Sequence, residues 1–307
     1  TLAEHHDVEV VLVMLEALEA LRALGVPPVT IHVNNRKLSE GFYRGLGIED
    51  TASVLQRVDK FDKIGPVAVA ELLTGELGLS AAQADACVRL AGIAGSDESF
   101  VDDVRALGVE DELLDTGLEE LSSLIRVARR SVPDRVVVDL KIARGLDYYT
   151  GTVYETLLVG SEKLGSVASG GRYDSLASDG KTTFPGVGYS FGITRILAPL
   201  IGKGGLTASR SVPSAVLVAV DNEEAREQAI DVAARLRTRG IAVEVAPKAD
   251  KFGKQIRFAE RRGIPFVWFG AGYDDSVKDI RTGDQSPASP DAWTPPAEDA
   301  CPTVVAG

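Results

Sequence analysis

The stretch from residue 136 to residue 197 constrains the fold most, because it alternates short β-prone runs with glycine-rich turns. Residues 136–140 and 152–158 are apolar or β-branched and are bounded by turn-forming residues, which predicts two neighbouring antiparallel strands. A third short strand is expected over residues 165–168. Residues 188–200 carry apolar side chains at helical spacing, so the predicted order is strand, strand, strand, helix.

Arginines in this stretch lie beside glycines or at the end of an element, in a chain of formal net charge -12. The three are Arg144, Arg172 and Arg195. Arginine binds carboxylate and phosphate in a bidentate manner, and glycine lets a ligand approach the backbone. Taken singly, each arginine is better explained by a surface ion pair with a nearby aspartate. Together, and with the hydroxyls of Tyr148, Tyr149 and Tyr173, they favour an anion-binding pocket.

Three longer blocks resemble a known family. They are RGLDYYTG at 144–151, GGRYD at 170–174 and GVGYSFGITR at 186–195. In this order they closely resemble the histidyl-tRNA synthetases, which are class II aminoacyl-tRNA synthetases. The first two blocks resemble the histidine-binding signatures of that family and the third its motif 3. The run VNNRKL at 33–38 adds to the resemblance.

The resemblance implies a histidine pocket. Arg144 aligns with the catalytic arginine of the family, which contacts the substrate carboxylate and the α-phosphate of ATP. Tyr149 and Tyr173 align with tyrosines that line the pocket, and Tyr148 is expected beside them. Two glycines of the second block would let the substrate approach closely. They are Gly170 and Gly171.

The resemblance also implies an ATP site, to which Arg144 contributes. Arg195 aligns with the motif 3 arginine, which lies over the adenine and reaches the triphosphate, and Gly192 would admit the adenine. Mg²⁺ is expected with ATP, held mainly by the phosphates. Ile193 and Thr194 stand where many class II enzymes carry Leu-Glu, so a role for that glutamate is in doubt here.

Neither motif 1 nor motif 2 of the class is recognisable, and the only methionine, Met14, lies within an apolar helical pattern. In the family, motif 1 forms the homodimer interface and motif 2 supplies an arginine to the α-phosphate. We therefore expect a C-terminal fragment of a histidine–tRNA ligase that is not catalytically competent alone. The alternative is a non-catalytic, synthetase-like regulatory or tRNA-binding protein, which the intact blocks around Arg144 and Arg195 disfavour.

The predicted fold class is α+β, a partial class II antiparallel catalytic domain with a helical insertion, followed by an α/β anticodon-binding domain. Strands alternating with helices after residue 213 favour a βαβ sheet. The predicted segments are a catalytic remnant at 1–201 with its insertion at about 55–131, a linker at 202–213, the α/β domain at 214–283, and a partly disordered tail at 284–307.

Basic residues of the second domain recur at steps of three or four, on one face of a helix predicted over residues 251–262. They are Lys248, Lys251, Lys254, Arg257 and Arg261. A basic helix face is often only solvated. In an acidic chain that resembles a tRNA ligase, the face is expected to bind the phosphate backbone of tRNA-His.

Other sites and locations are disfavoured. GYSFG at 188–192 matches the nucleophile elbow of α/β hydrolases, but that mechanism needs a later histidine and none follows His32. Three histidines, and two cysteines far apart, favour no metal site and a reduced, cytoplasmic compartment. No apolar run approaches the ~20 residues of a membrane span, so no membrane association is expected.

Overall fold

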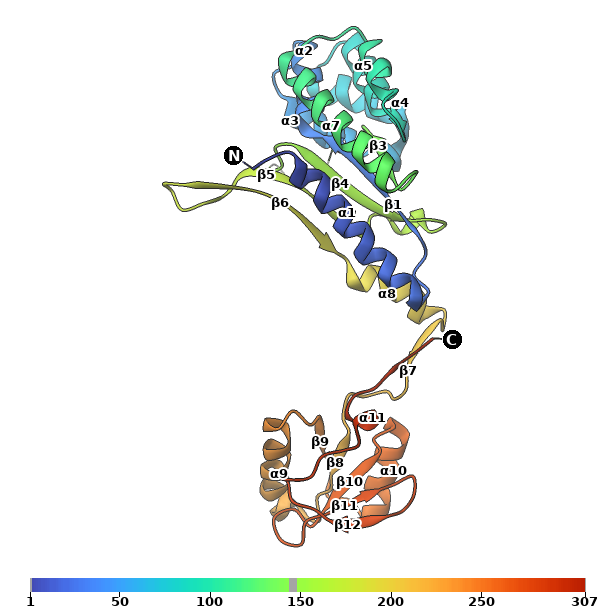
Figure 1. The fold of residues 1–307 in the computed structure, drawn as a ribbon, viewed down its shortest axis with the longest axis vertical. Coiled ribbons are helices and arrows are strands. Elements are labelled where there is room, and N and C mark those ends of the chain that lie inside the picture. The colour runs from blue at the N-terminus through green and yellow to red at the C-terminus, as the bar shows by residue number, and fades with distance from the viewer. Residues whose placement is uncertain (1, 144–147, 307) are drawn as a thin grey trace. The chain divides into compact units, whose positions relative to one another are not determined.

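The computed structural model describes residues 2–143 and 148–306, and the chain forms two compact units, residues 1–200 and 201–307 (Figure 1). A six-stranded sheet of order β2-β3-β1-β4-β5-β6 organises the first unit. Its strands are β1 (Val29–Asn35), β2 (Ala94–Gly95), β3 (Val136–Asp139), β4 (Thr152–Leu158), β5 (Ala168–Ser178) and β6 (Thr183–Phe191). Its helices are α1 (His5–Ala20), α2 (Arg36–Gly45), α3 (Thr51–Val58), α4 (Phe61–Leu77), α5 (Ala81–Ala91), α6 (Phe100–Arg105), α7 (Glu112–Ser131) and α8 (Ile193–Gly202). No helix in the described ranges is long and apolar enough to cross a membrane.

The strand β1 lies between β3 and β4. It runs parallel to β3, with Ile31 opposite Val136, and antiparallel to β4 along its whole length. The prediction that 136–140 and 152–158 are neighbouring strands is therefore wrong, although both strands exist. Local β-propensity identifies a strand but not its partner, and here the partner comes from more than one hundred residues earlier in the chain.

Two long strands, β5 and β6, form a hairpin where the sequence predicts one short strand and the start of a helix. The turn is closed by Asp179, whose carboxylate accepts hydrogen bonds from the backbone N–H groups of Lys181 and Thr182. The helix α8 begins only at Ile193. From residue 136 onward the order is thus four strands and then a helix. The fourth strand arises because residues 186–191, despite their poor β-propensity, pair with β5.

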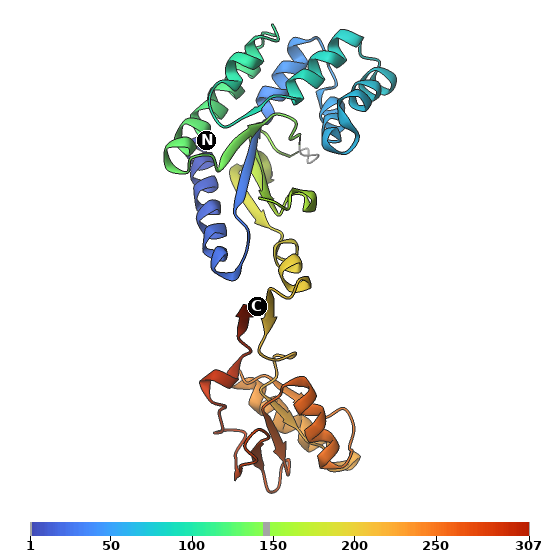
Figure 2. The same ribbon diagram turned by 90° about the vertical axis from the view of Figure 1, so that its right-hand side faces the viewer.

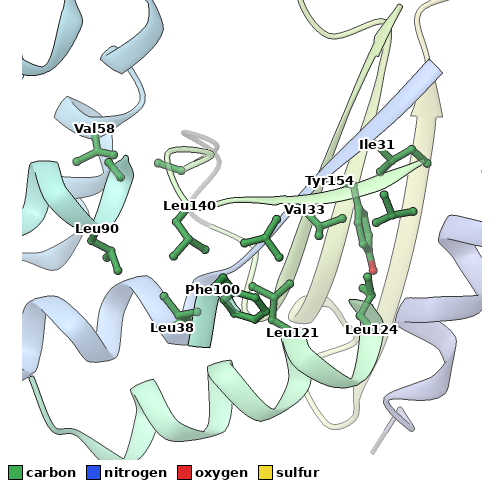
Figure 3. Packing of buried hydrophobic residues seen from close by; sticks show 14 of the residues in the cluster. Ile31, Val33, Leu38, Val58, Leu90, Phe100, Leu121, Leu124, Leu140 and Tyr154 are labelled. Atoms are coloured by element: carbon green, nitrogen blue, oxygen red, sulfur yellow. The ribbon is translucent and has the colours of Figure 1, made fainter. Parts of the chain in front are cut away.

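One face of this sheet is covered by α1 and α7. Figure 3 shows Ile31 and Val33 of β1 and Tyr154 of β4 gathered against Leu121 and Leu124 of α7, and all five side chains are almost fully buried. The Tyr154 hydroxyl also donates a 2.9 Å hydrogen bond to a backbone carbonyl of α1. Figure 2 shows α1 lying along this face. The opposite face, which we call the open face, carries the candidate site.

The helices between residues 51 and 131 pack in the same hydrophobic core as the sheet. Three of them, α3, α5 and α7, begin with a side-chain cap, from Asp50, Ser80 and Asp111, and the Ser80 hydroxyl and Gln83 form a capping box at the start of α5. Two glycines bring α2 and α7 into backbone contact, since a Cβ atom at Gly41 would lie 2.1 Å from the Leu114 nitrogen. The equivalent distance from Gly117 to the Leu38 nitrogen is 2.2 Å. The last helix of the predicted insertion is therefore part of the main core.

The second unit is a five-stranded sheet of order β12-β11-β10-β8-β9. Its elements are β8 (Val216–Val218), α9 (Arg226–Thr238), β9 (Val243–Val245), α10 (Phe252–Arg262), β10 (Phe266–Phe269), β11 (Ser276–Asp279), β12 (Gln285–Pro287) and α11 (Ala297–Ala300). The strand β8 is parallel to both β9 and β10. Parallel strands are almost always joined by right-handed crossovers, which for the order β9-β8-β10 puts α9 and α10 on opposite faces of the sheet. This βαβ arrangement agrees with the alternation in the sequence.

The final segment, for which composition predicts partial disorder, makes specific contacts. Trp293 packs edge-on against Phe266 and Trp268, at ring-centroid distances of 5.4 and 5.8 Å. The Arg239 guanidinium donates to the carbonyl of Trp293. Within the predicted linker, β7 (Leu206–Ala208) pairs with β13 (Val304–Ala306). Aromatic contacts and strand pairing thus position a segment whose composition alone suggests little packing.

Candidate active site

Three tyrosines meet on the open face of the first sheet. Tyr148 and Tyr149 precede β4 and Tyr173 lies in β5, yet the Tyr148 ring is 4.5 Å from that of Tyr149 and 6.5 Å from that of Tyr173. Ile142 and Val153 pack with Tyr149 as a small apolar cluster. The structure therefore brings together all three tyrosines that the sequence proposes for one pocket.

Glycines in β5 and β6 make room for these rings. A Cβ atom at Gly171 would lie 2.6 Å from Tyr149 Cδ1, and one at Gly186 would lie 2.6 Å from Tyr173 Cε2. A Cβ atom at Gly170 would point to the other face, 1.9 Å from the Gly188 carbonyl oxygen. The space beside these glycines is filled by other parts of the protein. From the sequence, Gly170 and Gly171 are expected instead to let the substrate approach the backbone.

The side chain of Arg172 lies on the face covered by α1. Its guanidinium donates to Asp7 Oδ2 at 2.7 Å, to Asp174 Oδ1 at 3.1 Å and to the Leu2 carbonyl at 2.6 Å. Arg172 therefore forms a buried, structural ion pair with Asp7 and is not part of an anion pocket on the open face. This corrects the three-arginine interpretation. The reason is the alternation of β5, which directs Arg172 away from the face that Gly171 and Tyr173 share.

Of the other two arginines, Arg144 falls in residues 144–147, outside the described residues. Arg195 lies in the first turn of α8 with an exposed side chain, and its Nη1 donates to the Ser166 carbonyl at 2.5 Å. Gly192 precedes this helix, and its N–H donates to the Val167 carbonyl at 2.8 Å. The motif 3 block thus forms the junction between β6 and α8.

A row of polar residues that no sequence motif marks crosses the open face beside the tyrosines. Strand register places four residues opposite one another on β1, β4, β5 and β6. They are His32, Glu155, Ser169 and Ser190. Asp139 Oδ2 lies 2.9 Å from His32 Nδ1 and 3.2 Å from the ammonium of Lys141, which also contacts Asp62 of α4. These residues are far apart in the sequence, and only the register of the paired strands aligns them.

A cavity of about 400 Å³ in the second unit lies beside α10. Four of the five predicted residues line it, namely Lys248, Lys254, Arg257 and Arg261. Asp250 and Glu260 line it too, and Asp250 Oδ1 is 3.1 Å from the Lys254 ammonium. All five predicted basic side chains are exposed.

Two family models match the chain. Residues 3–196 match the model described as histidyl-tRNA synthetase. The chain belongs to the histidyl-tRNA synthetase family. Residues 214–269 match a second model, described as an anticodon binding domain. The mixed sheet and helices of the first unit accord with the α+β fold of class II synthetases, as the sequence predicts.

Curated relatives and solved structures agree with this membership. The chain is 62% identical over 312 residues to the histidine–tRNA ligase of Cutibacterium acnes, covering 99% of this chain and 69% of the relative. It is 56% identical over 309 residues to that of Micrococcus luteus, covering 99% and 67%. The crystal structure of histidyl-tRNA synthetase from Nostoc sp. PCC 7120 superposes with a TM-score of 0.62 at 33% identity, covering 95% of this chain and 70% of that one.

One further neighbour shares the fold alone. It is titled an ATP phosphoribosyltransferase regulatory subunit/histidyl-tRNA synthetase, from Bacillus halodurans, and its TM-score is 0.55 at 22% identity. At that identity the likeness carries no argument about activity. Membership of the synthetase family rests on the two family models and the much closer curated relatives.

Proposed function

We propose that the chain carries the histidine–tRNA ligase function of its family. In this reaction the carboxylate of histidine attacks the α-phosphate of ATP and pyrophosphate leaves; the histidyl group then passes from the adenylate to a hydroxyl of tRNA-His, and AMP leaves. Two anions must be brought together, so the protein contributes mainly positioning and charge stabilisation. Family membership supports this proposal. The site supports it too, because tyrosine hydroxyls and glycines lie on the open face and the chain has few histidines for acid–base chemistry.

The observation that carries the proposal is the convergence of Tyr148, Tyr149 and Tyr173 on the open face. We assign to this cluster the imidazole of histidine. A tyrosine hydroxyl bonded to an imidazole nitrogen discriminates strongly, because an analogue that lacks the nitrogen leaves a buried polar group unpaired. Gly171 supports the cluster by letting Tyr149 lie against the sheet.

For the nucleotide we assign Arg144, Gly192 and Arg195. By family resemblance, Arg144 contacts the histidine carboxylate and the α-phosphate, and Arg195 lies over the adenine and reaches the triphosphate. The bond from Arg195 to the Ser166 carbonyl uses only one of the donors of its guanidinium, which leaves others for phosphate oxygens. ATP is bound as its Mg²⁺ complex, in which the phosphates supply most of the metal ligands.

For tRNA-His we assign the basic face of α10, defined by Lys248, Lys251, Lys254, Arg257 and Arg261. Neutralising two of these, as in Lys251→Gln with Arg257→Gln, should weaken tRNA binding and reduce the slope of log affinity against log salt by about one per lost phosphate contact. Lys181→Gln, an exposed change in the β5–β6 turn, is the matched control. An unchanged salt slope in the double variant would contradict the assignment.

Homodimerisation in the full-length protein and a cytoplasmic location complete the proposal. Both rest on family resemblance, and sedimentation equilibrium tests the first directly.

The test of the function is histidine-dependent exchange of labelled pyrophosphate into ATP, on this chain and on the chain preceded by its natural upstream residues. Exchange in either form supports the ligase. Exchange only in the longer form also supports the expectation that the chain alone is not competent. Absence of exchange in both, with histidine still bound, would contradict the ligase and favour a regulatory role.

A further inference from the structure

A buried asparagine, Asn34 of β1, lies beside the tyrosine cluster. Strand register places it opposite Val153 of β4, which in turn lies opposite Gly171 of β5. Val153 packs with Tyr149, whose ring lies against Gly171. Asn34 is only 1% exposed. Burial of an amide is costly unless its polar atoms are hydrogen-bonded, so the partners of Asn34 show what the amide does.

The amide of Asn34 bonds the segment that follows β3. Its Nδ2 donates to the carbonyl of Ile142 at 2.8 Å and to the carbonyl of Leu140 at 3.2 Å. It also lies 3.1 Å from Ser39 Oγ of α2, and its Oδ1 accepts the next backbone N–H at 2.7 Å. Since β3 ends at Asp139, both carbonyls lie past the end of the strand. Buried carbonyls need a donor, and Asn34 supplies one to each of them.

The segment that Asn34 bonds supports the tyrosine cluster. Ile142 is 7% exposed and packs with Tyr149 and Val153. The same segment leads directly into the block RGLDYYTG, which begins at residue 144 and contains Tyr149. A misplacement of about 1 Å in a substrate-positioning group can cost about a hundredfold in rate. The bonds to Asn34 therefore fix the part of the chain against which Tyr149 packs.

We propose that Asn34 is a positioning residue for the histidine pocket, because its amide fixes Ile142 and, through Ile142, the ring of Tyr149. The inference rests on the proposed function, in which the tyrosine cluster holds the imidazole. A purely structural role predicts a loss of stability with no selective loss of histidine affinity. Ser39 separates the two roles, because its hydroxyl bonds the same amide but belongs to α2 and not to the segment after β3.

Asn34→Ala is the direct test, measured by histidine-dependent pyrophosphate exchange in whichever form of the chain supports it. We expect the KM for histidine to rise about tenfold or more, with the KM for ATP nearly unchanged. Ser39→Ala keeps both carbonyl bonds and should leave both constants close to the parent values. Val11→Ala, a fully buried change in α1 on the covered face, is the control for lost stability and should do the same. Equal effects of Asn34→Ala and Val11→Ala on the KM for histidine would overturn the proposal.

A second readout needs no activity. The Cδ1 methyl of Ile142, observed by NMR and assigned through Ile142→Val, reports the position of the Tyr149 ring through its ring-current shift. The resonance should move in Asn34→Ala and keep its position in Ser39→Ala and Val11→Ala. If Asn34→Ala does not fold, Asn34→Ser, which keeps one hydroxyl donor, is measured in the same way.

An unmoved Ile142 resonance in the folded Asn34 variant would reject the positioning role. Absence of exchange by the parent chain in both of its forms would instead count against the ligase function. In that case the methyl resonance alone decides whether Asn34 positions the tyrosine cluster.

Discussion

The ring of Tyr149 lies against Gly171, so closely that a Cβ atom at position 171 would be 2.6 Å from Tyr149 Cδ1. A Cβ atom there would also lie 2.8 Å from the Thr152 carbonyl oxygen. No side chain fits at position 171 unless the tyrosine moves. The glycine of the second family block therefore determines where a tyrosine of the first block lies.

Gly171→Ala is expected to displace Tyr149 and to damage the candidate histidine pocket. Overpacking of this kind costs about 1–3 kcal/mol. We predict a rise in the KM for histidine of about tenfold or more and a modest loss of stability. Gly75→Ala is the matched control, since it lies in α4 with nothing within 4 Å of the added methyl and should be neutral or stabilising. Unchanged KM in Gly171→Ala would mean that the pocket does not depend on Tyr149.

Arg172→Ala should destabilise the first unit, because it leaves the buried Asp7 carboxylate without its cation. Breaking a buried pair by removing one partner costs about 3–5 kcal/mol. Urea unfolding followed by far-UV circular dichroism measures this, and tryptophan fluorescence gives an internal reference because both tryptophans lie in the second unit. Arg126→Ala, which breaks an exposed pair with Glu98, should cost less than about 1 kcal/mol. Equal losses in the two variants would contradict the structural role of Arg172.

The two cysteines should differ sharply in reactivity. Cys87 is buried in α5, and burial raises its pKa to about 12, so almost none of it is thiolate at neutral pH. Cys301 is exposed. Iodoacetamide labelling followed by mass spectrometry should therefore modify Cys301 in the native chain, and Cys87 only after urea is added. Similar native labelling rates would show that α5 does not shield Cys87.

Acid should weaken the second unit through Asp279. Hydrogen bonds from Arg281, which also reaches Asp299, hold the pKa of Asp279 below its ordinary value. The resulting stabilisation is fully present above the unfolded pKa of about 3.9 and is lost as the pH falls through the lower folded value.

Arg281→Gln should consequently lose less stability than the parent chain between about pH 6 and about pH 3, measured by tryptophan fluorescence in urea. The control is Arg237→Gln, because the Arg237 guanidinium bonds the Val243 carbonyl, which does not titrate. Parallel pH profiles for the parent chain and Arg281→Gln would contradict the contribution of this pair.

Periodic elements were predictable from the sequence, whereas their pairing was not. The apolar spacing over residues 4–24 predicts α1 and the turn after it. The β-branched run at 152–158 predicts β4 with the bounds that the structure shows. The placement of β1 between β3 and β4 depends on contacts between residues far apart in the chain. Local propensity carries no information about such contacts.

The error at Arg172 has the same origin. Residues 168–178 contain two adjacent glycines and few large apolar side chains, so the sequence does not predict one long strand there. Once they are paired as β5, alternation alone puts Arg172 on the face opposite Gly171 and Tyr173. The row that contains His32 and Glu155 was missed for the same reason, since register, not sequence spacing, aligns it.

Histidine-dependent pyrophosphate exchange by Tyr149→Phe tests the central claim most directly, in whichever form of the chain supports exchange. The change removes one hydroxyl, and the loss of a hydrogen bond to the imidazole predicts a KM for histidine about tenfold higher, with the KM for ATP unchanged. Tyr273→Phe, at a tyrosine that is 84% exposed in the second unit, should leave both constants unchanged. An unaltered KM for histidine in Tyr149→Phe would contradict the assignment of the tyrosine cluster as the histidine pocket.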